Sequence, residues 1–133
     1  MISFIAFGHK NLLGTHRTTL EFTKENRLTK KGDCILGINA TFSLEKIQQE
    51  LKKGKIKITI ETENYQDEFF AEYNPSFNHP EQMVIRTSDY VDERTFAINA
   101  TKAAKDIKRE LVEELKNEEN MITIFILYNE CKN

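Results

Sequence analysis

The sequence predicts an α+β fold that is mainly antiparallel β, with a β-sandwich or barrel-like core and two helices. Three observations lead to this expectation. Most periodic segments are short and alternate between apolar and polar residues, as strands with one wet face do. Only two segments have the spacing of an amphipathic helix. The strands do not alternate regularly with helices, which argues against a doubly wound parallel sheet.

The chain is expected to form a single domain over residues 1–133, because this length is enough to bury one hydrophobic core without disulfides. We find no linker, low-complexity segment or internal repeat in the sequence.

The first third of the chain predicts three strands and a short return. Ile2–Phe7 is apolar on both faces and is predicted to be a buried strand. Residues 18–23 alternate between apolar and polar side chains, as in a half-buried strand. A short return strand is expected from Leu28, broken at Gly32. Cys34–Ala40 is a second apolar strand, in which a glycine allows a bulge or a close backbone approach.

The first helix and the clearest strand follow each other. Ser43 is the predicted N-cap, and Gly54 is expected to end the helix. Lys55–Glu61 then alternates regularly between isoleucine and polar residues, which predicts a strand with a wet outer face. The helix would bury one apolar stripe, formed by Leu44, Ile47 and Leu51.

A hairpin, a loop and a further strand make up the next part. Glu68–Tyr73 is expected to pair with the preceding strand through a turn. Asn74–Glu81 contains both prolines and is therefore predicted to be a loop. Met83–Ser88 is predicted to be a strand, and the polar stretch Asp89–Thr95 follows it without regular structure.

The last part predicts the longest helix and a final strand. Asn99 would cap a helix that runs to about Lys116. Met121–Tyr128 is apolar on both faces, so we expect this strand to be central in the sheet or covered by a helix. The apolar stripe of the helix would be Ala103, Ala104, Ile107, Leu111 and Leu115.

Composition excludes several classes of protein. The net charge of −2 argues against wholesale binding of polyanions. Cys34 and Cys131 belong to no CxxC pair, so the chain has no zinc-ribbon or thioredoxin motif. The amino terminus does not resemble a signal peptide, and no apolar stretch is long enough to span a bilayer. We therefore expect a cytoplasmic protein with reduced thiols and no contact with a membrane.

Polar residues gather in three segments that border predicted strands. The first segment is the run Gly8–Thr19, which holds two of the three histidines and is denser in donors and acceptors than a strand connection requires. The second is Gly32–Cys34. The third includes Arg86, Ser88, Asp89, Arg94, Thr95 and Lys102.

These segments suggest one polar pocket for a small anionic or nucleotide-like ligand. Arginine offers a planar fork for carboxylates and phosphates, so the ligand-binding candidates centre on three arginines. The candidates to orient the ligand or transfer a proton would be His9, His16 and Asp33. The ligand-binding residues would be Arg17, Arg86, Ser88 and Arg94.

Other readings of the same residues stay open. Arg86 can form a structural ion pair with Asp33 or Asp89. The spacing of seven between the two amino-terminal histidines matches no standard zinc motif, so no metal site is predicted. Cys34 begins an apolar strand, which favours a buried, inert thiol over a nucleophile. No cofactor follows from the sequence, and whether the protein is an enzyme stays open.

Two alternative functions compete with the ligand-binding hypothesis. The chain could bind RNA through a lysine edge formed by Lys30, Lys31, Lys52, Lys53, Lys55 and Lys57. The phenylalanines and tyrosines are not interleaved with these lysines as they are in common RNA-binding motifs. The chain could instead be a structural or homo-oligomeric protein, in which the polar clusters form hydrogen-bond networks or part of an interface.

Five ordered motifs cover nearly the whole chain. They are Gly8-His9-x-Asn11, Gly14–Thr19 with Glu21, Leu28-Thr29 with Gly32–Ile35 and Gly37, Met83–Arg86 with Ser88-Asp89, and Arg94-Thr95 with Ala97-Ile98, Ala100 and Lys102–Ala104. Together they resemble a small archaeal family, domain of unknown function 371. The resemblance implies an archaeal single-domain protein with a β-sandwich-like core and helices, and it brings no activity, substrate or catalytic residue to these positions.

Overall fold

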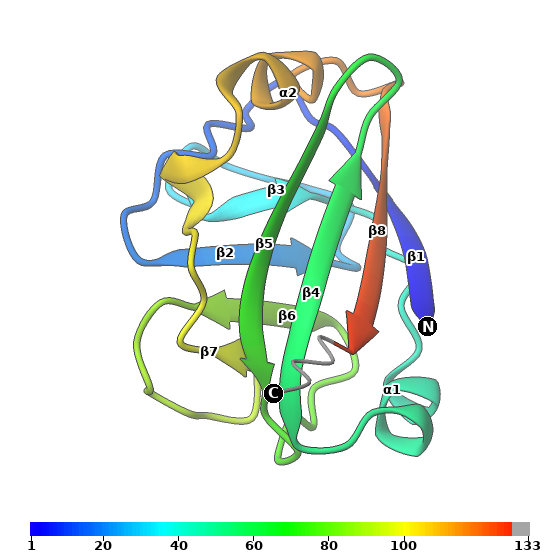
Figure 1. The fold of residues 1–133 in the computed structure, drawn as a ribbon. Helices are drawn as coiled ribbons and strands as arrows, with labels where there is room; N and C mark the ends of the chain where they lie inside the picture. The colour runs from blue at the N-terminus through cyan, green and yellow to red at the C-terminus, as the bar shows by residue number, and fades with distance from the viewer. Residues whose placement is uncertain (129–133) are drawn as a thin grey trace.

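The computed structural model describes residues 1–128, and Figure 1 shows their path. The strands are β1 (Ile2–Phe7), β2 (Thr19–Thr23), β3 (Ile35–Gly37), β4 (Gly54–Glu61), β5 (Gln66–Tyr73), β6 (Gln82–Arg86), β7 (Thr95–Ile98) and β8 (Met121–Tyr128). The helical segments are α1 (Leu44–Glu50), the 3-10 turn η1 (Ala104–Asp106) and α2 (Arg109–Glu114).

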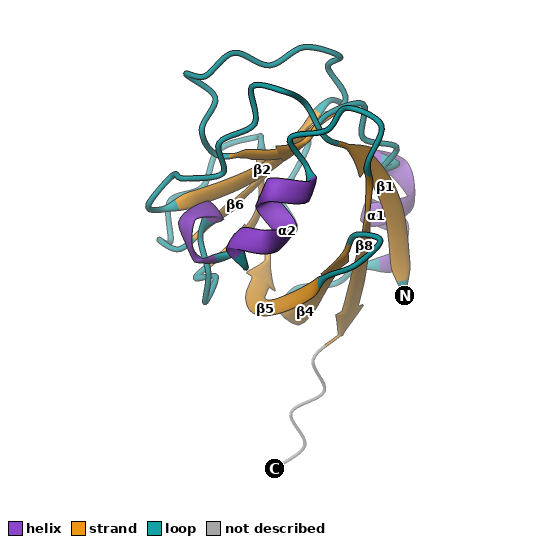
Figure 2. Ribbon diagram, turned by 90° about the horizontal axis from the view of Figure 1, so that it is seen from above, coloured by secondary structure: helices purple, strands orange, loops and turns teal. Residues whose placement is uncertain are grey.

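These strands form one mixed sheet in the order β1-β8-β4-β5-β7-β6-β2-β3. The pairs β2–β3 and β6–β7 are parallel and the remaining pairs are antiparallel, so the α+β class with mainly antiparallel pairing is confirmed. The sheet bends into two layers, with β1, β8, β4 and β5 in front and the other four strands crossing behind them (Figures 1 and 2). Its two ends touch at one bridge, where Phe7 and Ile38 exchange two backbone hydrogen bonds of 2.8 Å.

The hydrophobic core lies between the two layers. Alternate residues of β4 and β8 point into it, and Ile56, Ile58 and Ile60 are fully buried there as their alternation predicts. Aromatic rings fill the rest, with Phe4 in edge-to-face contact with Phe22 at a centroid distance of 5.7 Å. Such pairs add about 0.5–1.5 kcal/mol to the stabilisation from burial alone.

The fold contains an internal repeat that the sequence analysis did not find. The letters Ile-Asn-Ala-Thr occur at Ile38–Thr41 and again at Ile98–Thr101, after β3 and after β7. Both asparagines have a left-handed backbone, with φ of 52° at Asn39 and 51° at Asn99. Each threonine then bonds the neighbouring strand in the same way. Thr41 N donates to Ile5 O at 2.9 Å, and Thr101 N donates to the corresponding carbonyl of β5 at 2.8 Å.

The repeat extends over the complete sheet. β1-β2-β3-α1-β4 corresponds to β5-β6-β7-α2-β8, and the two parallel pairs have the same register shift at the same place. If each strand is replaced by its counterpart, the neighbours in the sheet stay the same and the order runs in the opposite direction. The β5–β7 pairing then becomes a contact between β1 and β3, which is the contact that the Phe7–Ile38 bridge makes. The halves are therefore related by a pseudo-two-fold axis through the β2–β6 and β4–β8 pairs, on which Glu21 pairs with Val84 and Thr59 with Phe125.

The amino-terminal half differs from the sequence prediction at three places. Residues from Leu28 form turns and no strand, and β3 is shorter than the predicted Cys34–Ala40 because Asn39 turns the chain. The Ser43 hydroxyl caps α1 by accepting from Lys46 N at 3.1 Å, as predicted. The helix nevertheless ends at its C-cap Leu51, three residues before Gly54, which instead begins β4.

The predicted long helix from Asn99 to Lys116 is wrong. Residues 95–98 form β7, Asn99 makes a left-handed turn, and only η1 and α2 are helical. The guanidinium of Arg109 ties this interrupted stretch to the amino-terminal loop, because it donates to the carbonyl groups of Ala104, Ile107 and Gly14. The predicted apolar stripe is buried all the same, because the turns bring its members to the same core.

Candidate functional site

The strongest concentration of bonded polar side chains lies on the outer surface of the rear layer, which we call the β2–β6 polar face. Leu20 and Phe22 of β2 and Met83 and Ile85 of β6 point into the core, so the residues between them point outward. The loop between β6 and β7 adds further polar groups. The face consists of Thr19, Glu21, Cys34, Gln82, Arg86, Asp92, Arg94 and Thr95.

Two arginines on this face share one carboxylate. The guanidinium of Arg86 donates through Nε to Thr95 Oγ1 at 2.9 Å and through one terminal nitrogen to Asp92 Oδ2 at 3.2 Å. Arg94 approaches the same Asp92 oxygen at 3.6 Å and donates to Gln82 Oε1 at 3.2 Å. Thr95 Oγ1 donates to Asp92 Oδ1 at 3.0 Å. The network fixes the short connection between the parallel strands β6 and β7.

The two arginines differ in their access to solvent. The side chain of Arg86 is only 13% exposed, and its guanidinium lies 4.8 Å from the ring centroid of Tyr90. The side chain of Arg94 is 42% exposed, so N–H groups not bonded to protein face the solvent. Asp92 lies between them, and its pKa is below the usual range although partial burial opposes this, because Thr95 and both arginines stabilise the anion.

Glu21 is a buried carboxylate at the centre of the face. The residue is only 7% exposed. Within residues 1–128 its carboxylate accepts one hydrogen bond, from Cys34 Sγ at the long distance of 3.7 Å. Burial raises the pKa of Glu21, and the nearby Arg94 guanidinium opposes this increase only in part. A carboxyl group with so few partners is poised to hydrogen-bond a ligand as acceptor or, when protonated, as donor.

Cys34 is unsuited to nucleophilic chemistry. Burial, together with the negative charge of Glu21, raises the pKa of its thiol to about 12. The reactive form of cysteine is the thiolate, so the thiol stays protonated and donates to Glu21. Cys34 is half-buried, so the expectation of a buried thiol is met only in part, and its inertness stays a prediction.

His16 lies at the edge of the face with a defined proton arrangement. Its Nδ1 accepts from the backbone N–H groups of Thr18 and Thr19, both at 3.1 Å, and lies 3.0 Å from the Thr19 hydroxyl. An accepting Nδ1 requires that the neutral ring carry its proton on Nε2. His16 can therefore donate one hydrogen bond from Nε2.

The structure brings some of the predicted site residues together and separates others. Arg86 and Arg94 share the network, while His16 lies beside Thr19 at one end of the face. Asp33 meets this region through its backbone, since its carbonyl accepts from Thr15 N and His16 N. The other predicted members are Arg17, which is exposed next to His16, and Ser88, whose hydroxyl accepts from Tyr90 N at 3.4 Å.

His9 lies elsewhere in the fold. Its backbone N–H donates to Leu115 O at 2.8 Å, and its ring lines a hollow of about 380 Å³ together with Asn39 and Glu118. The predicted ion pair of Arg86 with Asp33 or Asp89 is also wrong, because the partner is Asp92. The six lysines of the predicted edge are divided: Lys30 and Lys31 lie in the β2–β3 connection, Lys52 and Lys53 between α1 and β4, and Lys55 and Lys57 on β4.

Of the eight residues of the face, only Arg86 and Arg94 were predicted as ligand-binding residues, and Glu21 and Asp92 are two of those that were not. Glu21 alternates with Leu20 and Phe22 along β2, which already places it on the same face as Thr19. That periodicity was a usable signal. Nothing in the sequence singled out Asp92 from the other acidic residues of its loop, because the loop conformation decides which of them meets Arg86.

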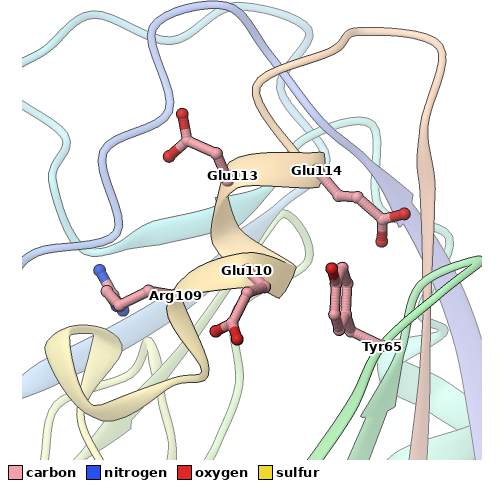
Figure 3. A pocket seen from close by; sticks show the side chains of 5 residues that line it. All are labelled: Tyr65, Arg109, Glu110, Glu113 and Glu114. Carbon is pink, nitrogen blue, oxygen red and sulfur yellow. The ribbon is translucent and has the colours of Figure 1, made fainter.

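The hollow drawn in Figure 3 is acidic and shallow. It has a volume of about 530 Å³ and lies between α2 and the turn that joins β4 to β5. Arg109 and Glu113 point away from Tyr65 in this view, and Arg109 is already bonded to three carbonyl groups. Its side chains therefore do not converge on one point.

Within residues 1–128, no group of three or more His, Cys, Asp or Glu side chains lies close enough to hold a metal ion. No helix in this part of the chain is both long and apolar enough to cross a membrane.

Comparison with known proteins gives the family. The family model described as "Domain of unknown function (DUF371)" matches residues 4–128. The chain belongs to this family. It is also 46% identical over 124 residues to the uncharacterized protein MJ0206 of Methanocaldococcus jannaschii, an alignment that covers 88% of this chain and 92% of that protein. The resemblance read from the five motifs is thereby confirmed.

Proposed function

We propose that this DUF371 protein binds a small anionic or nucleotide-like ligand on the β2–β6 polar face. Arg94 would bind the anionic group, with Arg17 near the edge of the face and Arg86 holding the network in place. Glu21 and His16 would form hydrogen bonds to the polar groups of the ligand. Ser88, in the same loop as Asp92, would line the edge of this site.

The observation that carries the proposal is that the internal repeat does not extend to this network. Val84 N donates to Arg94 O, and in the other half Glu21 N donates to Cys34 O. In the same way Thr95 N donates to Asp92 O, and Ile35 N donates to Gly32 O. These matched bonds define the counterparts of the polar residues in the other half. Arg86 corresponds to Thr23, Asp92 to Gly32, Arg94 to Cys34 and Thr95 to Ile35.

The first half therefore builds the same parallel strand pair, with the same register shift, from uncharged residues. The fold does not require two arginines and an aspartate at this place. Groups that a fold does not require, and that hold charge at partly buried positions, are candidates for binding. The solvent-facing N–H groups of Arg94 and the poorly bonded Glu21 give a ligand both donors and an acceptor.

Thermal unfolding of the full chain in the presence of inorganic phosphate, AMP and ADP tests the proposal. We expect at least one of these probes to raise the melting temperature in a saturable manner. Arg94→Gln should abolish the increase, whereas the control Lys116→Gln should retain it. Lys116 is a suitable control because its side chain is 40% exposed and pairs with a carboxylate as Arg94 does.

Either of two results would overturn the proposal. One is that none of the three probes shifts the melting temperature at millimolar concentration. The other is that Arg94→Gln binds the active probe as tightly as the wild-type protein does. A loss of binding that also occurs in Lys116→Gln would point to overall charge instead of the polar face.

We also infer that the core is barrel-like. The Phe7–Ile38 bridge occupies the position that the β5–β7 pairing occupies in the other half, which supports closure of the sheet between β1 and β3. Hydrogen exchange tests this inference, because closure predicts that the amides of Phe7 and Ile38 exchange as slowly as those of β5 and β7. Fast exchange at both amides would contradict it.

A further inference from the structure

The outward side of the front layer is unusually apolar for a partly exposed surface. On β8, the inward residues Ile122, Ile124 and Ile126 are buried, but Met121 and Leu127 point outward and are 45% and 36% exposed. A strand with one side in water normally carries polar residues on that side. We call this surface the β8 face. Its apolar members are Ile5, Phe7, Phe70, Met121, Phe125 and Leu127.

No helix of residues 1–128 lies over the β8 face. Figure 1 looks directly at it, and α1 and α2 lie at the lower and upper ends of the layer instead. β8 is central, between β1 and β4, so one of the two sequence expectations for this strand is met. Its central position explains the apolar inner side but not the apolar outer side, which no helix of the described residues covers.

Charges on the same face indicate what kind of partner fits. Lys57 and Glu61 lie on β4, two residues before and two residues after Thr59. Thr59 pairs across the sheet with Phe125, at the middle of the face. The face also carries Lys55, Glu68 and Glu72, so it has no single sign that would select a strongly acidic or basic partner.

We infer that the β8 face packs against the β8 face of a second copy of this chain. The two-fold axis would lie between the two faces, perpendicular to the strands, at the level of Thr59 and Phe125. The strands of the second copy then run in the opposite direction. Lys57 then lies opposite Glu61 of the second copy, and Glu61 opposite its Lys57. Phe125 of each copy meets Phe125 of the other at the centre. The arrangement pairs both charges and covers the apolar residues, as isologous interfaces do.

The existing ion pair of Lys57 is compatible with this packing. Lys57 Nζ lies 2.9 Å from Glu68 Oε2 of the adjacent strand, and its side chain is 36% exposed. An ammonium group has three donors, so a second carboxylate can approach on the open side. No salt bridge to Glu61 is present within residues 1–128, which leaves that carboxylate available to the second copy.

The mass of the full chain in solution, measured by sedimentation over a wide range of concentrations, is the first test. We expect a dimer at high concentration that dissociates on dilution. Glu61→Lys should weaken dimerisation by about tenfold, because it places two like-charge pairs in the interface. The double variant Lys57→Glu/Glu61→Lys should restore the wild-type affinity, since the charges are then exchanged and again complementary.

A cross-link at the proposed axis is the second test. Phe125→Cys in a Cys131→Ser background should give a dimer with a short bis-maleimide, whereas the exposed control Glu45→Cys should not. A linker is needed because packed sheets lie about 10 Å apart, too far for a direct disulfide.

A monomer at every concentration would overturn the inference, and so would a dimer that neither cross-links at position 125 nor responds to charge reversal. If deletion of residues 129–133 is required before dimers form, the occupant is the end of this chain and the inference is equally overturned.

Discussion

Replacing Thr95 alone should cost more stability than replacing its whole network. Thr95 is fully buried, and its hydroxyl makes three hydrogen bonds: it accepts from Arg86 Nε and Asp92 N and donates to Asp92 Oδ1. Thr95→Val keeps the shape and removes all three. Two of these bonds involve charged groups, and leaving their partners unsatisfied should lower the free energy of unfolding by about 3 kcal/mol.

The combined variant Arg86→Thr/Asp92→Gly/Thr95→Ile replaces the network by its counterparts from the other half. It removes both charged groups and the hydroxyl of this network together, so none of the three is left without its partner, and its main cost is the chain entropy of the new glycine, about 0.5–1 kcal/mol. We therefore expect a loss of about 1–2 kcal/mol, smaller than that of the single change, because removing both partners of a buried polar contact can be nearly neutral.

Urea denaturation followed by circular dichroism measures both values, provided that the slope of the transition is unchanged. Arg86→Met is a useful control because it removes one charged partner and should fall between the two variants. The reasoning would be refuted if the combined variant lost as much stability as Thr95→Val or more. That outcome would mean that the second half needs the network to fold.

Three further predictions concern single residues. Because burial raises the native pKa of Glu21 above its unfolded value, its contribution to stability is fully present below the unfolded pKa and is lost as pH rises through the native pKa. Glu21→Gln should therefore be more stable than the wild type at pH 7 but not at pH 4, as denaturation at the two values would show; equal differences at both would be contrary evidence. With the pKa of Cys34 at about 12, only about one thiol in 10⁴ is ionised at pH 8. In a Cys131→Ser background, labelling by a thiol reagent should therefore be slow until urea unfolds the chain, and rapid labelling of the native protein would contradict a raised pKa of Cys34. Asn39→Ala and Asn99→Ala should each cost about 1 kcal/mol, because both positions are left-handed, whereas glycine should be tolerated at either. Unequal tolerance of glycine at the two sites, measured by thermal unfolding, would argue against equivalent turns.

The strands that the sequence predicted best are those in which burial decides the pattern. Residues 55–61 alternate because one side faces the core, and Met121–Tyr128 is apolar on both sides because it is central and carries the β8 face. The long helix failed for the opposite reason. Its apolar stripe is buried, but the left-handed backbone of Asn99 and hydrogen bonds to neighbouring strands prevent a continuous helix. No local sequence pattern predicts such long-range bonds.

The repeat was missed because its two copies are not in constant register along the chain. Asn99 follows Asn39 by 60 residues, but Phe70 follows its counterpart Ile5 by 65, so loops of different length shift the spacing. Only one four-letter stretch is identical. For the candidate site, arginine chemistry pointed to Arg86 and Arg94, and only the folded loop could show that they share Asp92.

The pairing of Glu21 with Val84 has a consequence for how such a molecule can be built. Each is the counterpart of the other, so two identical half-chains joined by a true two-fold axis would place the same residue at both positions. Two buried glutamates would then face each other at about 5 Å, and their mutual repulsion would force at least one to be protonated. A single carboxyl group at this point is possible only in a chain whose two halves differ in sequence. Covalent joining of the halves thus permits a chemical group that a symmetrical assembly could not hold.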